Sequence, residues 1–168
     1  MTEPITIRSA AVDDVPTILA FIRKLADYER LAHQVEATEN VLRVSLFGQR
    51  PGAEVLLAFV GGEAAGFALF FHNFSTFVGR PGLYLEDIFV DEGYRGRGVG
   101  RALFARLGEI ARERKCRRFE WAVLDWNESA IRFYRSLGAR ELSDWRLFRL
   151  SGDELKNLPG PSETGGRR

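Results

Sequence analysis

The sequence pattern most diagnostic of the fold is DEGYRGRGVGRALF at residues 91–104. Its first eleven positions hold four glycines and three arginines, and apolar residues at helical spacing follow. Glycine lets a ligand approach the backbone, and a helix start offers free N–H groups at the positive end of its dipole. The pattern predicts an anion site, suited to phosphate or pyrophosphate, where a strand passes into a helix. A flexible turn with solvated arginines is the plainer alternative.

The residue order in this stretch excludes two familiar phosphate loops. A Walker A loop requires Lys after its second glycine, but Val99 follows Gly98 here. A dinucleotide loop, G-x-G-x-x-G, fails because Arg101 and Leu103 stand at its last position in the two possible frames. A nucleic-acid surface is disfavoured, since no aromatic platform is interleaved with the arginines.

Alternating strand and helix patterns flank the glycine stretch. Apolar residues repeat every second position in strands and about every 3.6 positions in helices. Strands are expected at 5–10, 54–60, 64–71, 82–90, 119–124 and 144–150. Helices are expected from 13–14 to about 28, from Thr38, at 99–115, and at 127–138 between an Asn127 cap and Gly138. This order predicts an α/β fold with one twisted mixed sheet and helices on both faces.

Composition limits the classes of function. The 168 residues carry a net charge of +1, so no global field draws the protein to nucleic acid or membrane. Cys116 is the only cysteine, which excludes an intramolecular disulfide and suits a reducing cytoplasm. With only two histidines, no metal site is expected. We expect one domain at 1–155, a flexible polar tail at 156–168, and a cytoplasmic location without a secretion signal.

Residues 95–100, RGRGVG, resemble the Q/R-x-x-G-x-G/A signature of the GNAT N-acetyltransferase superfamily, with Arg95, Gly98 and Gly100 at the signature positions. Five stretches, LADYE, LYLEDIFV, YRGRGVG, WNESAIRFYRSLGA and WRLF, are similar in order to the diamine (spermidine/spermine) and thialysine N-acetyltransferases. The similarity spans about residues 5–150. It implies a GNAT fold, acetyl-CoA as co-substrate and a homodimer.

The resemblance assigns the co-substrate to two segments. It implies that the pyrophosphate binds the glycine stretch and that the end of the preceding strand pairs with the pantetheine arm. A second contact is implied at the start of the helix after Asn127. The residues implied are Ile88, Phe89, Val90, Arg95, Gly96, Arg97, Gly98, Val99, Gly100, Arg101, Asn127, Ser129, Ala130 and Tyr134.

Two residues match catalytic positions of the family. Glu86 is the expected general base, with an ordinary cation-binding carboxylate as the alternative. Tyr134 is the expected general acid, with a core aromatic beside Ile131 and Leu137 as the alternative. Because strand side chains alternate, Glu86 and Asp87 are expected on opposite faces and not to form a coupled pair.

The acceptor side is expected to be acidic and to hold a small cationic amine, such as a polyamine, a diamine or thialysine. The family positions for this substrate are Tyr28, Glu29, Glu86, Asp87, Glu120, Trp121 and Ala122. The sequence departs from the animal diamine enzymes in a short connection at 61–62, in Phe77 where Trp is common, and in fewer acidic residues before Trp145. The expected reaction is therefore direct acetyl transfer to such an amine in a ternary complex. An amino acid, a protein N-terminus or lysine, or a non-catalytic acyl-CoA sensor remain alternatives.

Overall fold

The centre of the structure is a five-stranded sheet whose strand order follows chain order, β1 to β5. Neighbouring strands are antiparallel except β4 and β5, which are parallel. The computed structural model describes residues 3–159, in two compact units, 1–122 and 123–168. The elements are β1 Ile5–Ser9, η1 Val12–Asp14, α1 Val15–Tyr28, η2 Ala32–Gln34, α2 Glu39–Phe47, β2 Glu54–Val60, β3 Glu63–Ser75, β4 Arg80–Val90, η3 Glu92–Tyr94, α3 Val99–Glu113, β5 Phe119–Trp121, α4 Glu128–Ser136 and α5 Gly152–Lys156.

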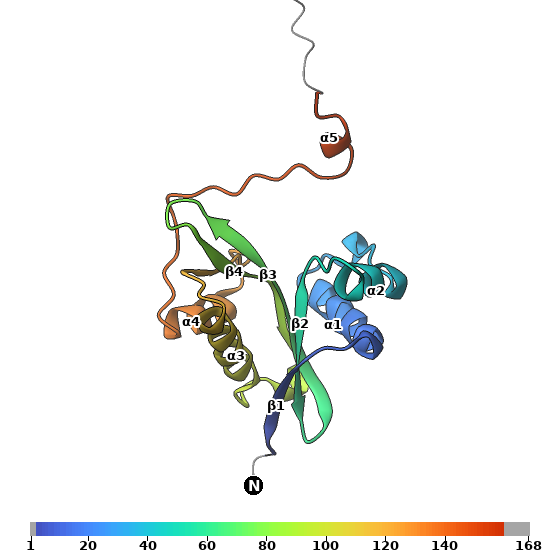
Figure 1. The fold of residues 1–168 in the computed structure, drawn as a ribbon. Helices are drawn as coiled ribbons and strands as arrows, with labels where there is room; N and C mark the ends of the chain where they lie inside the picture. Colours follow the sequence, from blue (N-terminus) through green and yellow to red (C-terminus); the bar gives the residue numbers. More distant parts are fainter. Residues whose placement is uncertain (1–2, 160–168) are drawn as a thin grey trace, which may run out of the picture. The chain divides into compact units, whose positions relative to one another are not determined.

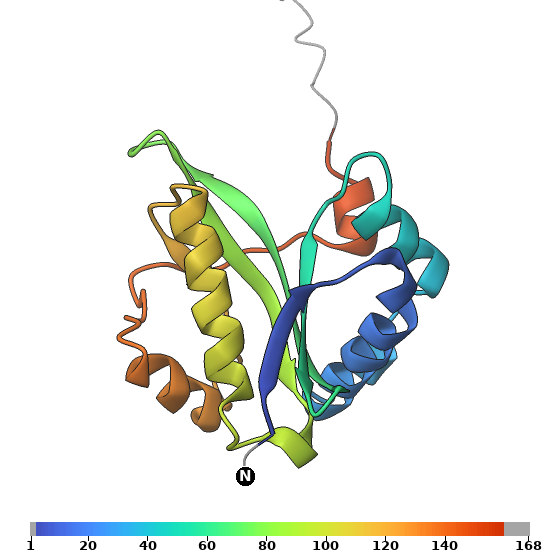
Figure 2. The ribbon, with the colours of Figure 1, turned by 60° about the horizontal axis from the view of Figure 1, so that its bottom comes forward.

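Helices cover both faces of the sheet in the first unit. Figures 1 and 2 show α1 and α2 on one face and α3 on the other. The α1 face has a continuous apolar core in which the rings of Phe21 and Phe67 stack at 5.7 Å, and Phe89 packs beside them. On α3, Leu103 and Leu107 are fully buried. The prediction of a mixed α/β sheet flanked by helices on both faces is confirmed.

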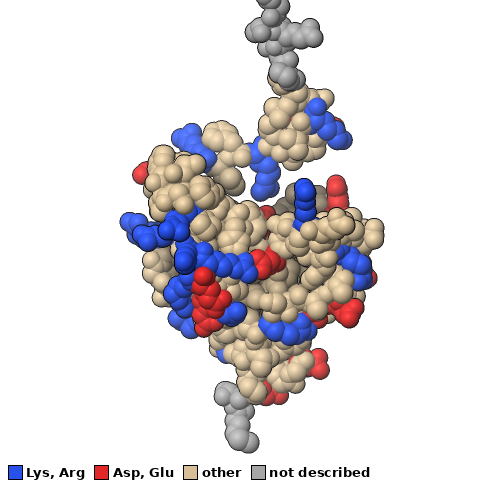
Figure 3. Space-filling model, viewed as in Figure 1, with Lys and Arg blue, Asp and Glu red and all other residues tan. Residues whose placement is uncertain are grey.

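Local sequence signals account for most of the element boundaries. Thr38 accepts a hydrogen bond from the Val41 amide and so begins α2, as expected from its hydroxyl. Gly61 and Gly62 both have positive φ angles and join β2 to β3 in a tight hairpin, as predicted. Figure 3 shows basic and acidic side chains interleaved over α3, where Arg106 pairs with neighbouring glutamates. This mixed surface fits a helix whose opposite side packs on the sheet.

β4 contains one extra residue, Glu86, relative to its partner β3. Asp87 lies opposite Leu69 and Leu85 lies opposite Phe70, so the register shifts at Glu86. Leu69 packs against the α1 core, whereas the guanidinium of Arg114, at the end of α3, lies 5.9 Å from the Phe70 ring. The bulge therefore places Leu85 on the α3 face and Asp87 on the α1 face.

Two strand predictions need correction. The strand expected at 119–124 ends at Trp121, because β5 follows β4 only as far as Leu85, just before the bulge. The strand expected at 144–150 is wrong, since the described residues form no ladder there and Trp145 and Phe148 are exposed. An alternating pattern becomes a strand only when its backbone groups find a partner.

The second unit contains α4 and the short helix α5. Asn127 caps α4 by accepting from the Ala130 amide at 3.2 Å, and Gly138 ends it with a φ of 86°, both as predicted. Ser151 begins α5, which the sequence patterns did not indicate. Of the predicted tail, residues 160–168 lie outside the described part of the chain, and the boundary at 155 stays a prediction.

Candidate active site

The connection from β4 to α3 forms a loop of exposed glycines. Asp91 accepts a hydrogen bond from the Gly93 amide, and a short 3-10 turn leads into the loop. Gly96 and Gly98 have φ angles of 75° and 92°, a region that side chains other than glycine rarely adopt. A methyl group built on Gly96 would meet nothing within 4 Å. The glycines are thus required by the backbone, and they leave open space above it.

The start of α3 presents amide donors to this open space. The amide of Ala102 donates to the Gly98 carbonyl at 3.0 Å, so the amides of residues 99–101 precede this helical bond. The helix dipole adds positive potential at the same point. Arg97 and Arg101 are exposed beside it. Donors, dipole, space and arginine charge together fit a phosphate or pyrophosphate group.

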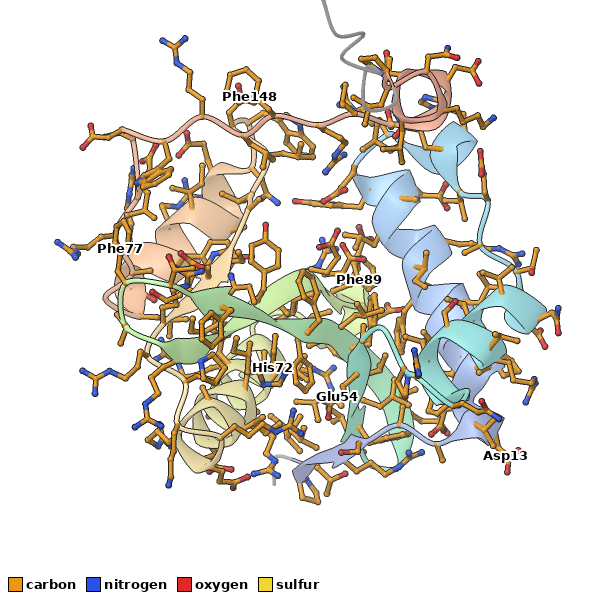
Figure 4. The ribbon with its side chains drawn as sticks, turned by 45° about the horizontal axis from the view of Figure 1, so that its top comes forward. Asp13, Glu54, His72, Phe77, Phe89 and Phe148 are labelled. Atoms are coloured by element: carbon orange, nitrogen blue, oxygen red, sulfur yellow. The ribbon has the colours of Figure 1, made fainter. Side chains whose placement is uncertain are left out.

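One edge of β4 is left unpaired by β5 beyond the bulge. Pairing between the two strands ends at Leu85 and Trp121. The Asp91 amide donates to Ala65 in β3, and strand alternation therefore turns the backbone groups of Phe89 toward β3 and those of Ile88 and Val90 toward the open edge. Phe89 itself is buried and faces α1 (Figure 4). Of the three predicted pantetheine contacts, Ile88 and the Val90 amide lie on the open edge, whereas the Val90 carbonyl accepts a hydrogen bond from Arg95 Nε at 3.0 Å.

The negative charges of Glu29, at the end of α1, and of Glu86 both act on Asp87 at the bulge of β4. Burial raises the pKa of Asp87 to about 6, with further contributions from the negative charges of Glu86 and Glu29. Burial also raises the pKa of Glu29. The bulge breaks the regular alternation on which the expectation of opposite faces for Glu86 and Asp87 rested, and the charge of Glu86 adds to the raised pKa of Asp87.

The predicted acceptor residues on β5 are engaged in contacts within the first unit. Glu120 accepts a hydrogen bond from Asn73 at 2.8 Å and forms an ion pair with the Arg118 guanidinium at 2.9 Å. The Trp121 ring packs edge-on against Phe104 at 5.2 Å. The negative charge of Glu120 is thus already compensated. Its predicted role in binding the amine stays a prediction, as do those of Trp121 and Ala122.

Within the second unit, α4 carries the remaining predicted residues, namely Ser129, Ala130 and Tyr134 after the Asn127 cap. The rings of Phe133 and Tyr134 lie 5.6 Å apart. The backbone of Ala139 donates to the Tyr134 carbonyl at 3.2 Å, which closes the helix end. The roles predicted for these residues toward the co-substrate stay predictions.

Neither nucleophilic nor metal chemistry is indicated by the described side chains. Burial raises the pKa of the Cys116 thiol, with a smaller opposing effect from Arg114, and this disfavours the reactive thiolate. No three His, Cys, Asp or Glu side chains among residues 3–159 come together as metal ligands would. Over the same residues, no helix has the length and apolar character to cross a membrane.

Comparison with known families identifies the family to which the chain belongs. A sequence model of the Acetyltransferase (GNAT) family matches residues 20–139, well over half of the chain. The chain belongs to the GNAT acetyltransferase family. The glycine loop, the bulge of β4 and the open strand edge all fall within this GNAT match.

Relatives of this GNAT chain include two curated enzymes and one solved structure. A pig protein named thialysine N-epsilon-acetyltransferase is 38% identical, over 93% of this chain and 98% of its own length. An Arabidopsis thaliana protein named L-ornithine N5-acetyltransferase is 33% identical, over 90% and 86%. An integron cassette protein of V. cholerae superimposes with a TM-score of 0.76 at 26% identity, over 90% and 95%. The protein is thus an acetyltransferase of the GNAT family.

Proposed function

We propose that this protein transfers the acetyl group of acetyl-CoA to the primary amine of a small cationic substrate, by direct transfer in a ternary complex. The observation that carries the proposal is the buried Asp87 carboxyl, which feels the negative charges of Glu86 beside it on β4 and of Glu29 at the end of α1. Such a group favours a substrate with positive charge. The names of the pig and Arabidopsis relatives, whose substrates are small amines, support the same class.

The glycine loop and the open edge of β4 fit acetyl-CoA. Positive φ at Gly96 and Gly98, the donors at the start of α3, and Arg97 and Arg101 suit its pyrophosphate. The edge of β4 at Ile88 and the Val90 amide, beyond the last β4–β5 pair, suits the amides of the pantetheine arm. When bound, acetyl-CoA supplies an activated thioester. The chain's own residues then have to deprotonate the amine and protonate the departing thiolate.

Asp87 is the stronger candidate for the general base. An alkyl amine has a pKa of about 10.4, so almost all of it is protonated at neutral pH. With a pKa of about 6, Asp87 is charged at pH 7 and yet more basic than an ordinary aspartate. Glu86, expected as the base from the resemblance, is exposed and together with Glu29 suits the task of holding the substrate cation.

Tyr134 is proposed as the general acid for the thiolate. A phenol ordinarily has a pKa of about 10, and it can protonate a thiolate whose acid has a pKa of about 8.5 when the two groups are held close. The resemblance at WNESAIRFYRSLGA supports this role.

A cytoplasmic location and a homodimer complete the proposal. The exposed aromatic residues Phe77, at the β3–β4 turn (Figure 4), and Phe148 suit an interface, and light scattering tests the dimer.

The test is CoA release from acetyl-CoA in the presence of a panel of amines. Thialysine, ornithine, spermidine and spermine represent the proposed class, and neutral amino acids and a peptide with a free N-terminus represent the alternatives. Turnover with at least one cationic amine, at a kcat/KM well above that of the others, supports the proposal. Tight acetyl-CoA binding in calorimetry without turnover of any amine would indicate an acyl-CoA sensor and overturn it.

A further inference from the structure

Arg95, in the glycine loop, points its guanidinium toward α1. Its Nε donates to the Val90 carbonyl at 3.0 Å, and the guanidinium carbon lies 4.9 Å from the centre of the Tyr28 ring and 5.6 Å from that of Phe89. The carboxylate of Glu92 lies 3.6 Å away. Arg95 therefore has partners on the strand, on the helix and within its own turn.

Arg97, two residues along the same loop, differs in this respect. Its guanidinium lies 5.4 Å from the ring of Tyr94, which belongs to the same connection. That contact joins the loop to itself and not to α1. The two arginines thus have the same charge and nearly the same position in sequence but different surroundings, and each serves as a control for the other.

The end of α1 that Arg95 contacts leads directly to Glu29, whose charge acts on Asp87. Tyr28 is the last residue of α1, and Glu29 is its C-cap. One turn earlier, Lys24 forms an ion pair with Asp91, at the start of the loop. The last two turns of α1 are therefore attached to the connection between β4 and α3 at two points, through Lys24 and through Tyr28.

We propose that Arg95 is a positioning residue for the acceptor amine, which holds the C-terminal end of α1 and thereby places Glu29 beside the bulge of β4. The inference rests on the proposed function. It assigns Arg95 a role different from that of a phosphate ligand. Arginine suits this role because its flat guanidinium can stack on an aromatic ring while its Nε–H donates a hydrogen bond in the plane of the guanidinium. Neither lysine nor glutamine can do both.

The first test compares Arg95→Gln with Arg97→Gln as the matched control. Amide hydrogen exchange of peptides covering residues 22–31 reports whether the end of α1 loosens, and calorimetry reports the Kd for CoA. Arg95→Gln should speed exchange in these peptides and leave the Kd for CoA within about twofold. Arg97→Gln should leave exchange unchanged and weaken CoA. These readouts need no turnover, so they remain decisive about the contact even if the proposed function fails.

The second test is the KM for the amine. Loss of one cation–π contact and one hydrogen bond predicts an amine KM about tenfold higher in Arg95→Gln, with the KM for acetyl-CoA little changed. Tyr28→Leu should give a similar increase, and Arg95→Gln with Tyr28→Leu should be no worse than either alone.

Three results would overturn the inference. The first is a Kd for CoA that rises in Arg95→Gln as much as in Arg97→Gln. The second is faster exchange in α1 with an unchanged amine KM. The third is an effect of the double variant equal to the product of the two single effects, since that would mean that Arg95 and Tyr28 act independently.

Discussion

Replacing Asp87 with Asn should make the protein more stable and less active at the same time. The Asp87 carboxyl has a pKa near 6 in the folded chain against an ordinary value of 3.8, a difference of about two pH units. At about 1.4 kcal/mol for each unit, burying the charged form opposes folding by up to about 3 kcal/mol above pH 6. Asparagine has nearly the same shape and no charge, so it removes this cost.

The sign of the pH dependence follows from the two protonation states. Well below pH 4 the carboxyl is protonated in both the folded and the unfolded chain, and Asp87 then resembles Asn. Between about pH 4 and pH 6 the unfolded chain releases this proton in water, whereas the buried carboxyl of the folded chain still holds it. The stability of the wild type relative to Asp87→Asn therefore falls between about pH 4 and pH 7 and is constant above that range.

Urea unfolding at several pH values measures this effect. At pH 8 the free energy of unfolding of Asp87→Asn should exceed that of the wild type by about 1–3 kcal/mol, and near pH 4 most of this gain should be lost. Asp13→Asn, at an exposed carboxylate far from the bulge (Figure 4), is the matched control and should show no such gain. Turnover of the best amine should fall by about 10²-fold or more. A gain that is absent at pH 8, or equal at pH 4 and pH 8, would refute a buried and desolvated Asp87.

Four further substitutions, one of them a control, test the backbone and the chemistry. Gly66→Ala places a methyl group 2.5 Å from the Phe89 carbonyl oxygen and should lower the free energy of unfolding by about 2–4 kcal/mol in the urea assay. Its control is Gly108→Ala, in the middle of α3, which should raise the free energy of unfolding by up to about 1 kcal/mol. Gly98→Val forces a β-branched residue to a φ of 92°, and should raise the KM for acetyl-CoA strongly at a cost of about 1–2 kcal/mol in stability; an unchanged KM would make the loop a simple turn. Tyr134→Phe should lower kcat by about 10²- to 10⁴-fold with little change in the KM for acetyl-CoA, and more than half of the wild-type turnover would transfer the general-acid role to another group.

The sequence was informative where a residue's own geometry determines the structure. Gly98 and Gly138 adopt positive φ angles that favour glycine, and Asn127 caps the helix that it precedes. These features depend on residues within one turn of each other. The glycine loop and the boundaries of α3 and α4 were therefore predictable without knowledge of any tertiary contact.

The predictions failed where structure depends on a partner elsewhere in the chain. Residues 144–150 alternate like a strand but have no ladder within the described residues, and the strand at 119–124 ends early because its neighbour changes register. Nothing in LEDIF marks a bulge, since it contains no glycine and continues the strand pattern. The contact of Arg95 with Tyr28 was equally invisible, because the two residues are far apart in sequence.

The bulge at Glu86 accounts for both halves of the proposed site. In a regular strand Asp87 would share the face of Leu85, which lies opposite Phe70 on the side of α3. The extra residue instead turns Asp87 to the α1 face, where the charge of Glu29 reaches it. The same irregularity follows directly on the last β4–β5 pair, so the edge at Ile88 and the Val90 amide is left open for the pantetheine arm. One inserted residue thus turns the proposed base toward the α1 face and lies where β4–β5 pairing ends, at the edge where we propose that acetyl-CoA binds.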